Sequence, residues 1–153
     1  MRFFLVLFFL PLFSFAQIKI DKGGDFWELN VDSALRKIRT VDSSYYTQIL
    51  EVCDQVSFWN NNFSSCEGSI GLKGTILISA IDVRSNNIDN LCAVLVHESI
   101  HLKFMKLGRI FDDPDDEEII CYQYELEFLR KVPGVSKSLI RHAEAQIKKL
   151  TSQ

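Results

Sequence analysis

The sequence VLVHESIHLKFM, residues 94–105, decides how the rest of the chain is interpreted. It contains His97-Glu98-Ser99-Ile100-His101, which fits the pattern H-E-x-x-H. In an α-helix, side chains four residues apart lie on the same face, so His97 and His101 can direct two imidazoles at one metal ion. Glu98 projects about 100° around the helix from His97. From this position it cannot join the two imidazoles as a third ligand, but it can reach a water molecule bound to the ion. The pattern therefore predicts a zinc site with Glu98 as general base.

The residues before the motif favour this interpretation. Residues 91–96 are apolar on every side, as in a helix that is buried all round. Two histidines and a glutamate are costly to bury in such a helix unless a partner satisfies them, and a metal ion does so. The alternatives are a helix that merely packs two histidines, and a chance match to the motif.

The N-terminus has the pattern of a cleavable secretory signal peptide. Met1-Arg2 precedes an apolar run over residues 3–15, and Ser14-Phe15-Ala16 ends the run with small residues. The run is too short to span a membrane comfortably, and no lipidation cysteine follows it. We therefore expect residues 1–16 to be removed and residues 17–153 to form one domain, secreted or periplasmic, without a stable membrane anchor.

Charge and cysteine content narrow the class of protein. The chain has 17 basic and 20 acidic residues, a balance that does not favour nucleic acid as a partner. Nothing in the sequence fixes the oligomeric state.

Four cysteines in an exported chain predict two disulfides, and we favour Cys53–Cys66 and Cys92–Cys121. A cysteine zinc site is the alternative, but no C-x-x-C pair is present.

Apolar periodicity predicts a mainly helical α+β domain. The convincing strand is the β-branched run at residues 74–83, with further strands possible at 18–20 and 69–72. Helices are expected at residues 26–38, 42–56, 90–106, 113–131 and 136–150, with residues 57–74 irregular. Asp89 or Asn90 is expected to cap the motif helix. The motif also resembles that of very small H-E-x-x-H zinc proteins, and this resemblance implies a zincin-like minimal domain in which a short sheet or edge strand, about residues 74–84, packs against the motif helix and the acidic helix that follows it.

A zinc ion on two histidines needs a third protein ligand and one open position. No third histidine follows the motif closely, and His142 is interpreted as a packed or surface residue. A carboxylate remains, and we choose Glu118, because a Cys92–Cys121 bond would turn its face of the helix towards the motif helix. Glu117 is the second choice, and Glu125 is less favoured.

An H-E-x-x-H motif followed by a glutamate on a later helix resembles the gluzincin branch of zinc metallopeptidases, and most resembles its very small members. Residues 118–129, EIICYQYELEFL, look like the Glu-x-x-x-Tyr…Phe-Leu helix of short H-E-x-x-H proteins. The resemblance covers about residues 74–129. Larger gluzincins usually carry an aspartate four residues after the ligand glutamate, to orient the first histidine, and here that position is Tyr122.

The resemblance implies hydrolysis of peptide bonds in a peptide or protein substrate. Zinc on His97, His101 and Glu118 would lower the pKa of a water molecule, and Glu98 would take its proton. Tyr122 is the expected oxyanion donor.

Several parts of this prediction leave alternatives open. Tyr124 or His142 would be the donor if Tyr122 is not. The strand at residues 75–83 would hold an extended substrate by edge pairing. Two other functions compete: a non-catalytic zinc-binding scaffold or partner-binding module of the same fold, and a disulfide-stapled structural domain with a chance motif.

Overall fold

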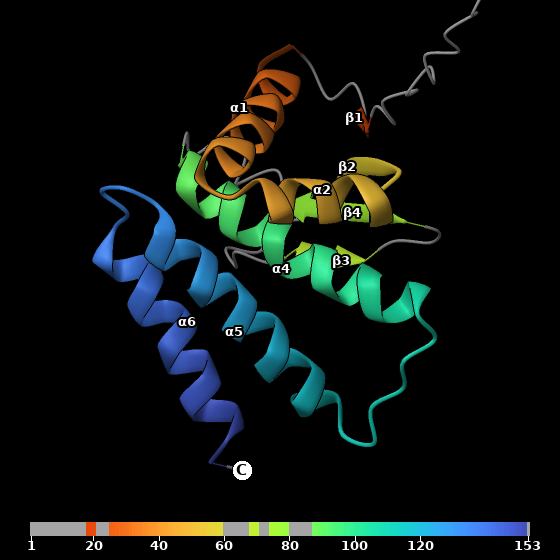
Figure 1. Ribbon diagram of the computed structural model, residues 1–153, viewed down its shortest axis with the longest axis vertical. Coiled ribbons are helices and arrows are strands. Elements are labelled where there is room, and N and C mark those ends of the chain that lie inside the picture. Colours follow the sequence, from red (N-terminus) through yellow and green to blue (C-terminus); the bar gives the residue numbers. More distant parts are fainter. Residues whose placement is uncertain (1–17, 21–24, 60–67, 71–73, 80–86, 153) are drawn as a thin grey trace, which may run out of the picture.

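The computed structural model describes residues 18–20, 25–59, 68–70, 74–79 and 87–152 (Figure 1). The predicted signal peptide, Cys66 and the predicted strand residues after 79 lie outside these ranges. The elements in chain order are β1 (Lys19–Ile20), α1 (Asp25–Val41), α2 (Ser43–Val52), β2 (Gln55–Trp59), β3 (Gly68–Ile70), β4 (Thr75–Ser79), α4 (Ile88–Lys106), α5 (Pro114–Lys131) and α6 (Lys137–Leu150). The prediction of a mainly helical chain with a small sheet is confirmed.

The sheet has four strands in the order β1-β2-β4-β3. Strands β1, β2 and β4 are parallel, and β3 runs antiparallel to β4. Along β2 and β4, Gln55 pairs with Thr75 and Trp59 with Ser79. Val56, Ile76 and Ile78 are fully buried, so this small sheet presents an apolar face to the core.

Two sequence-based expectations about the strands are wrong. Residues 55–59 form β2, although we expected a helix to residue 56 and irregular chain beyond it. Helix α2 ends at Val52 because Cys53 is extended and the next amides, of Asp54 and Gln55, donate to the carbonyl of Gly74. The strand predicted at 74–83 exists as β4, but it lies between β2 and β3 rather than at an edge. Among the described strands, β1 and β3 are at the edges, and β3 contacts α4.

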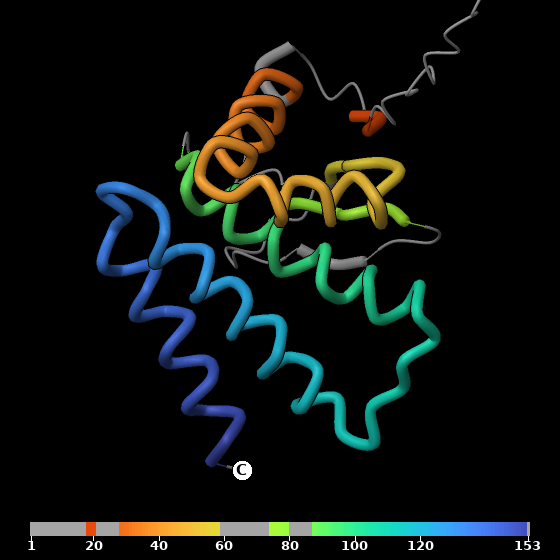
Figure 2. The backbone as a smooth tube through the Cα atoms, viewed as in Figure 1, coloured from red at the N-terminus to blue at the C-terminus, as the bar shows by residue number. Residues whose placement is uncertain are grey.

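Helix α4 is the centre of the molecule. Helices α1 and α2, the strands β3 and β4, and α5 all contact it, while α6 packs against α5 (Figure 2). Every residue from 91 to 100 is buried, which confirms the prediction of a helix buried on every side. None of the described helices is both long enough and apolar enough to cross a membrane. The largest fully buried side chains of the main core include Ile38, Ile49, Leu91, Leu95 and Phe128.

Side chains cap the N-termini of helices α2, α4, α5 and α6. Asp42, Asp113 and Ser136, the residues at which three of the predicted helices begin, each accept a backbone N–H of the first helical turn. For α4 the prediction is wrong, because the cap is Asn87, whose side chain accepts the amide of Asn90 at 3.1 Å. Asp89 instead forms an ion pair with Lys37 of α1, which ties α1 to the start of α4.

The predicted Cys92–Cys121 disulfide is also wrong, because both residues are buried free thiols. Contacts between His97 and Glu125 and between His101 and Glu117 show that α4 and α5 are antiparallel. Cys121 therefore lies opposite residues 97–101, more than one helical turn from Cys92.

The other predicted pair has one member outside the described ranges. Cys53 is a buried free thiol that donates to the carbonyl of Gln55 at 3.2 Å. Its predicted partner, Cys66, lies among the residues that the structure leaves undescribed.

Candidate metal centre

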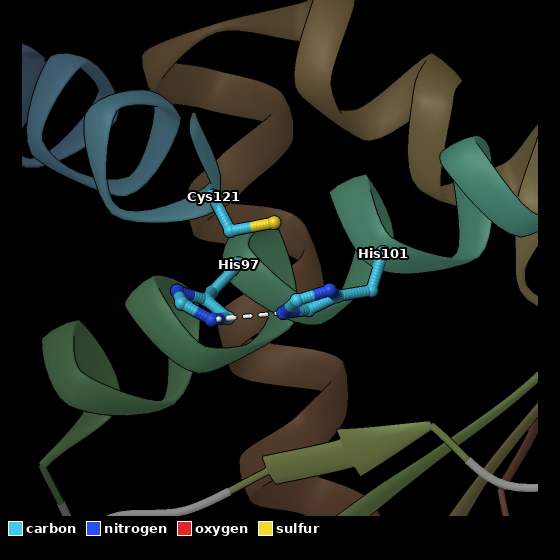
Figure 3. A group of neighbouring side chains, drawn as sticks. All are labelled: His97, His101 and Cys121. Carbon is cyan, nitrogen blue, oxygen red and sulfur yellow. Dashed lines mark hydrogen bonds between the residues drawn. The ribbon is translucent and has the colours of Figure 1, made fainter. Parts of the chain in front are cut away.

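Two imidazoles converge on the face of α4 that meets α5. The Nε2 atoms of His97 and His101 are 3.2 Å apart, and Figure 3 shows the rings reaching towards each other from consecutive turns. Their planes are tilted by 55°, with ring centroids 5.1 Å apart. The spacing of the motif therefore has the geometric result expected from the sequence.

Glu118 of α5 brings a carboxylate to the same place. Its Oε2 lies 3.4 Å from Nε2 of His97, and its Oε1 lies 3.3 Å from Nε2 of His101. A tetrahedral zinc ion with bonds of roughly 2.0–2.1 Å separates neighbouring ligand atoms by about 3.3–3.4 Å. The two N–O separations, each to a different oxygen of Glu118, are close to this value, so the carboxylate lies within reach of an ion held between the two imidazoles.

The outer nitrogens of both rings face carboxylates of α5. His97 Nδ1 lies 3.1 Å from Oε2 of Glu125, and His101 Nδ1 lies 2.8 Å from Oε1 of Glu117. A carboxylate on Nδ1 keeps the proton there and leaves the Nε2 lone pair free for a metal. Glu117 and Glu125, considered from the sequence only as ligands, thus hold the imidazoles in place.

Glu125 is the partner of His97 that sequence reasoning missed. The sequence-based expectation for a carboxylate that orients His97 is the fourth residue after Glu118, which is Tyr122. Glu125 lies one turn further along the same face of α5, and its longer side chain reaches the ring. The signal was present in the sequence as the i, i+7 spacing of Glu118 and Glu125.

Tyr122 packs edge-on against His97, with ring centroids 4.5 Å apart. The Tyr122 ring also lies 6.4 Å from the ring of His142 on α6, so Tyr122 stands between His97 and this third histidine. Tyr124 points elsewhere, because its ring meets Tyr45 of α2 and its carbonyl accepts the Tyr45 hydroxyl. Of the three proposed oxyanion donors, Tyr122 is the one that contacts His97, and His142 contacts the ring of Tyr122.

Glu98 is a buried carboxylate with no bonded partner. Glu98 is 5% exposed. Among the described residues, its carboxylate makes no hydrogen bond and no ion pair. Burial raises its pKa, against the opposing pull of His97 and His101. Buried polar groups nearly always have a partner, so the carboxylate of Glu98 is an exception among the described residues that calls for an explanation.

The electrostatics of the cluster favour a cation. Burial alone would lower the pKa of His97, but hydrogen bonds with Glu118 and Glu125 outweigh it and raise the pKa to about 9. The pKa of His101 is raised in the same way by Glu118 and Glu117. Hydrogen bonds from the two imidazoles hold the pKa of Glu118 well below its usual range. Positive charge is therefore stabilised between the rings and Glu118, as protons or as a metal ion.

Cys121 joins the imidazole pair from α5 (Figure 3). One ligand atom each from His97, His101 and Cys121 lie within 4.8 Å of one another, a group that could hold a metal ion. Sequence reasoning assigned this cysteine to a disulfide and so overlooked it as a possible ligand.

No protein-family model, curated protein or solved structure matches the chain. Function is therefore inferred from the side chains themselves.

Proposed function

We propose that this chain is a zinc-dependent peptidase of the gluzincin type. The proposal is carried by one observation, the meeting of Nε2 of His97, Nε2 of His101 and the carboxylate of Glu118 at separations of 3.2–3.4 Å. Two imidazoles and one carboxylate form the ligand set of catalytic zinc sites that keep a position open.

The chemistry of hydrolysis divides between the ion and the buried glutamate. Zinc bound there would polarise the carbonyl of a peptide bond and lower the pKa of a water molecule. Glu98 would take the proton of the attacking water and return it to the leaving amine, and burial, which raises the pKa of this carboxyl, favours its taking up a proton. Tyr122, against the edge of His97, is the candidate donor to the oxygen that gains negative charge.

The carboxylates of α5 hold the imidazoles in position for this chemistry. Glu125 and Glu117 each accept an Nδ1–H, which fixes the ring orientation and directs Nε2 at the ion. The resemblance to gluzincins therefore does not depend on an aspartate at position 122.

A polypeptide substrate has a candidate docking edge in β3. This strand is at the edge of the described sheet and contacts α4, the helix that carries His97 and Glu98. An extended peptide can add to such an edge through main-chain hydrogen bonds. We therefore propose β3, rather than the interior strand β4, as the strand that aligns the substrate.

A non-catalytic zinc-binding module is the second candidate function. It is favoured by Cys121, because a fourth protein ligand would leave the ion no open position. The third interpretation, a disulfide-stapled domain, loses its basis because Cys53, Cys92 and Cys121 are free thiols.

The test compares metal content with proteolysis. Glu98→Gln is expected to bind one zinc per chain and to lose cleavage of an unfolded protein such as casein by about 10²- to 10⁴-fold, the usual contribution of a general base. His101→Ala is expected to lose both zinc and cleavage.

The matched control is Glu127→Gln, which changes an exposed glutamate of α5 that pairs with Lys131. It should retain zinc and full cleavage. Purified protein without zinc, or Glu98→Gln with wild-type cleavage, would refute the proposed peptidase mechanism. Stoichiometric zinc without cleavage of any peptide tested would select the scaffold.

A further inference from the structure

We propose that Cys121 is a fourth protein ligand, which closes the metal centre by occupying the position that His97, His101 and Glu118 leave open. This inference rests on the proposed function, since it takes those three residues as the other ligands. It gives the site two forms, an open one with water on the ion and a closed one with the thiolate.

The hydrogen bonding of the thiols distinguishes Cys121 from the others. Cys53 donates to the carbonyl of Gln55, and Cys92 donates to the carbonyl of Ala34 at 3.4 Å. Cys121 is 0% exposed, and among the described residues its thiol makes no hydrogen bond. It is thus a fully buried polar group beside two imidazoles, without the backbone acceptor that the other two described thiols have.

The position of Cys121 permits coordination. It follows Glu118 by one turn on the same face of α5, so both side chains approach α4 together. Its Sγ and one ring nitrogen from each of His97 and His101 lie within 4.8 Å of one another. Zinc bonds of about 2.3 Å to sulfur and about 2.0–2.1 Å to nitrogen place those atoms roughly 3.6 Å apart. The remaining gap of at most about 1.2 Å is within the movement that rotation about χ1 gives a cysteine.

Closure exchanges water for the thiolate. The Cys121 thiol would release its proton to solvent and bind the ion as thiolate, and one water molecule would leave the ion in exchange. No electrons are transferred, so the step needs no oxidant or reductant. The closed form binds the ion with four protein ligands and cannot activate water, whereas the open form can. The thiolate also favours softer ions such as zinc over magnesium or manganese.

The experiment uses Co²⁺ as the probe, because a thiolate bound to cobalt adds a charge-transfer absorption in the near ultraviolet that imidazole and carboxylate ligands do not give. Full-length protein is loaded with one Co²⁺ and its spectrum is recorded for the wild type, Cys121→Ser and Cys92→Ser. Cys92 is the matched control, since it is also a 0% exposed thiol but lies on α4 more than one helical turn before His97, with its Sγ directed at the carbonyl of Ala34. The band is expected in the wild type and in Cys92→Ser and is expected to be lost in Cys121→Ser.

The outcomes separate this inference from the proposed function. Bound cobalt without the band in the wild type, or a band that survives in Cys121→Ser, overturns the role of Cys121 and leaves the peptidase proposal intact. The wild-type spectrum decides this even if the variants fail to fold. A chain that binds no cobalt overturns both proposals. A band together with no proteolysis supports Cys121 as a ligand and refutes the peptidase.

Discussion

The most informative perturbation is Glu125→Gln, because it removes one charge next to His97 and keeps the hydrogen-bond acceptor. Glu125 Oε2 lies 3.1 Å from Nδ1 of His97, and the two side chains are 9% and 10% exposed. Such a buried carboxylate raises the basicity of the imidazole and fixes its orientation. An amide at the same place still accepts the Nδ1–H but no longer supplies the negative charge.

The expected magnitude follows from comparable positions in metal sites. Loss of a carboxylate behind a metal-binding histidine costs about 10- to 100-fold in metal affinity, or roughly 1.4–2.7 kcal/mol. Glu117→Gln should cost less, because Glu117 is 27% exposed and solvent screens its charge on His101. Glu127→Gln should leave metal affinity unchanged, since the exposed Glu127 side chain pairs with Lys131 and not with either imidazole.

Competition between the protein and a chromophoric chelator for Zn²⁺ measures these affinities. Zinc affinity is predicted to fall most in Glu125→Gln and less in Glu117→Gln. It should stay at the wild-type value in Glu127→Gln. Glu125→Ala, which removes the acceptor as well, should lose more than Glu125→Gln. Equal zinc affinity for Glu125→Gln and Glu127→Gln would refute the assignment of Glu125 as the group that orients His97.

Three further predictions concern stability. Without metal, in the presence of a chelator, the pKa of His97 is raised from 6.5 to about 9, so protonated His97 stabilises the folded state. This stabilisation is complete below pH 6.5, and up to about 3 kcal/mol of the free energy of unfolding should be lost as the pH rises through 9. Urea unfolding over this pH range measures the loss, and stability that is constant or rises would contradict it. Asp42→Ala should cost about 1 kcal/mol by removing a helix cap, and Asp42→Asn should cost less because asparagine also caps. Chemical denaturation of both variants tests this, and equal losses would count against the cap. Gly74→Ala should cost more than Gly134→Ala, since both have positive φ but only at Gly74 would a new Cβ approach other atoms, at 2.6 Å and 3.1 Å. Thermal unfolding compares the two glycine variants, and a larger loss for Gly134→Ala would contradict the steric reasoning.

The helices and the histidine pair were predictable because they depend on local spacing. The i, i+4 separation of His97 and His101 fixes one face of one helix, whatever surrounds it. The caps Asp42, Asp113 and Ser136 likewise act within their own first turn.

Apart from the cap of α4, which is Asn87, the errors concern relations between distant segments. Val56 is buried in β2 and would be equally apolar in a helix, so periodicity could not distinguish the two. The choice of Glu118 agrees with its position beside the imidazoles, yet it depended partly on a Cys92–Cys121 bond that is absent. The register of α5 against α4 comes from packing, and no single-segment pattern contains it.

The phase of helix α5 has a consequence for recognising this centre in other sequences. Glu118, Cys121 and Glu125 all approach α4 because they are spaced at whole turns. One residue inserted between Glu118 and Cys121 would rotate the later side chains by about 100° and carry Cys121 and Glu125 away from His97. Insertions in the linker at residues 107–113 leave this phase unchanged. A chain with a longer linker but an intact E-x-x-C-x-x-x-E spacing can therefore retain the metal centre. A chain that has H-E-x-x-H but a changed spacing on the later helix has the motif without the side chains that complete the centre.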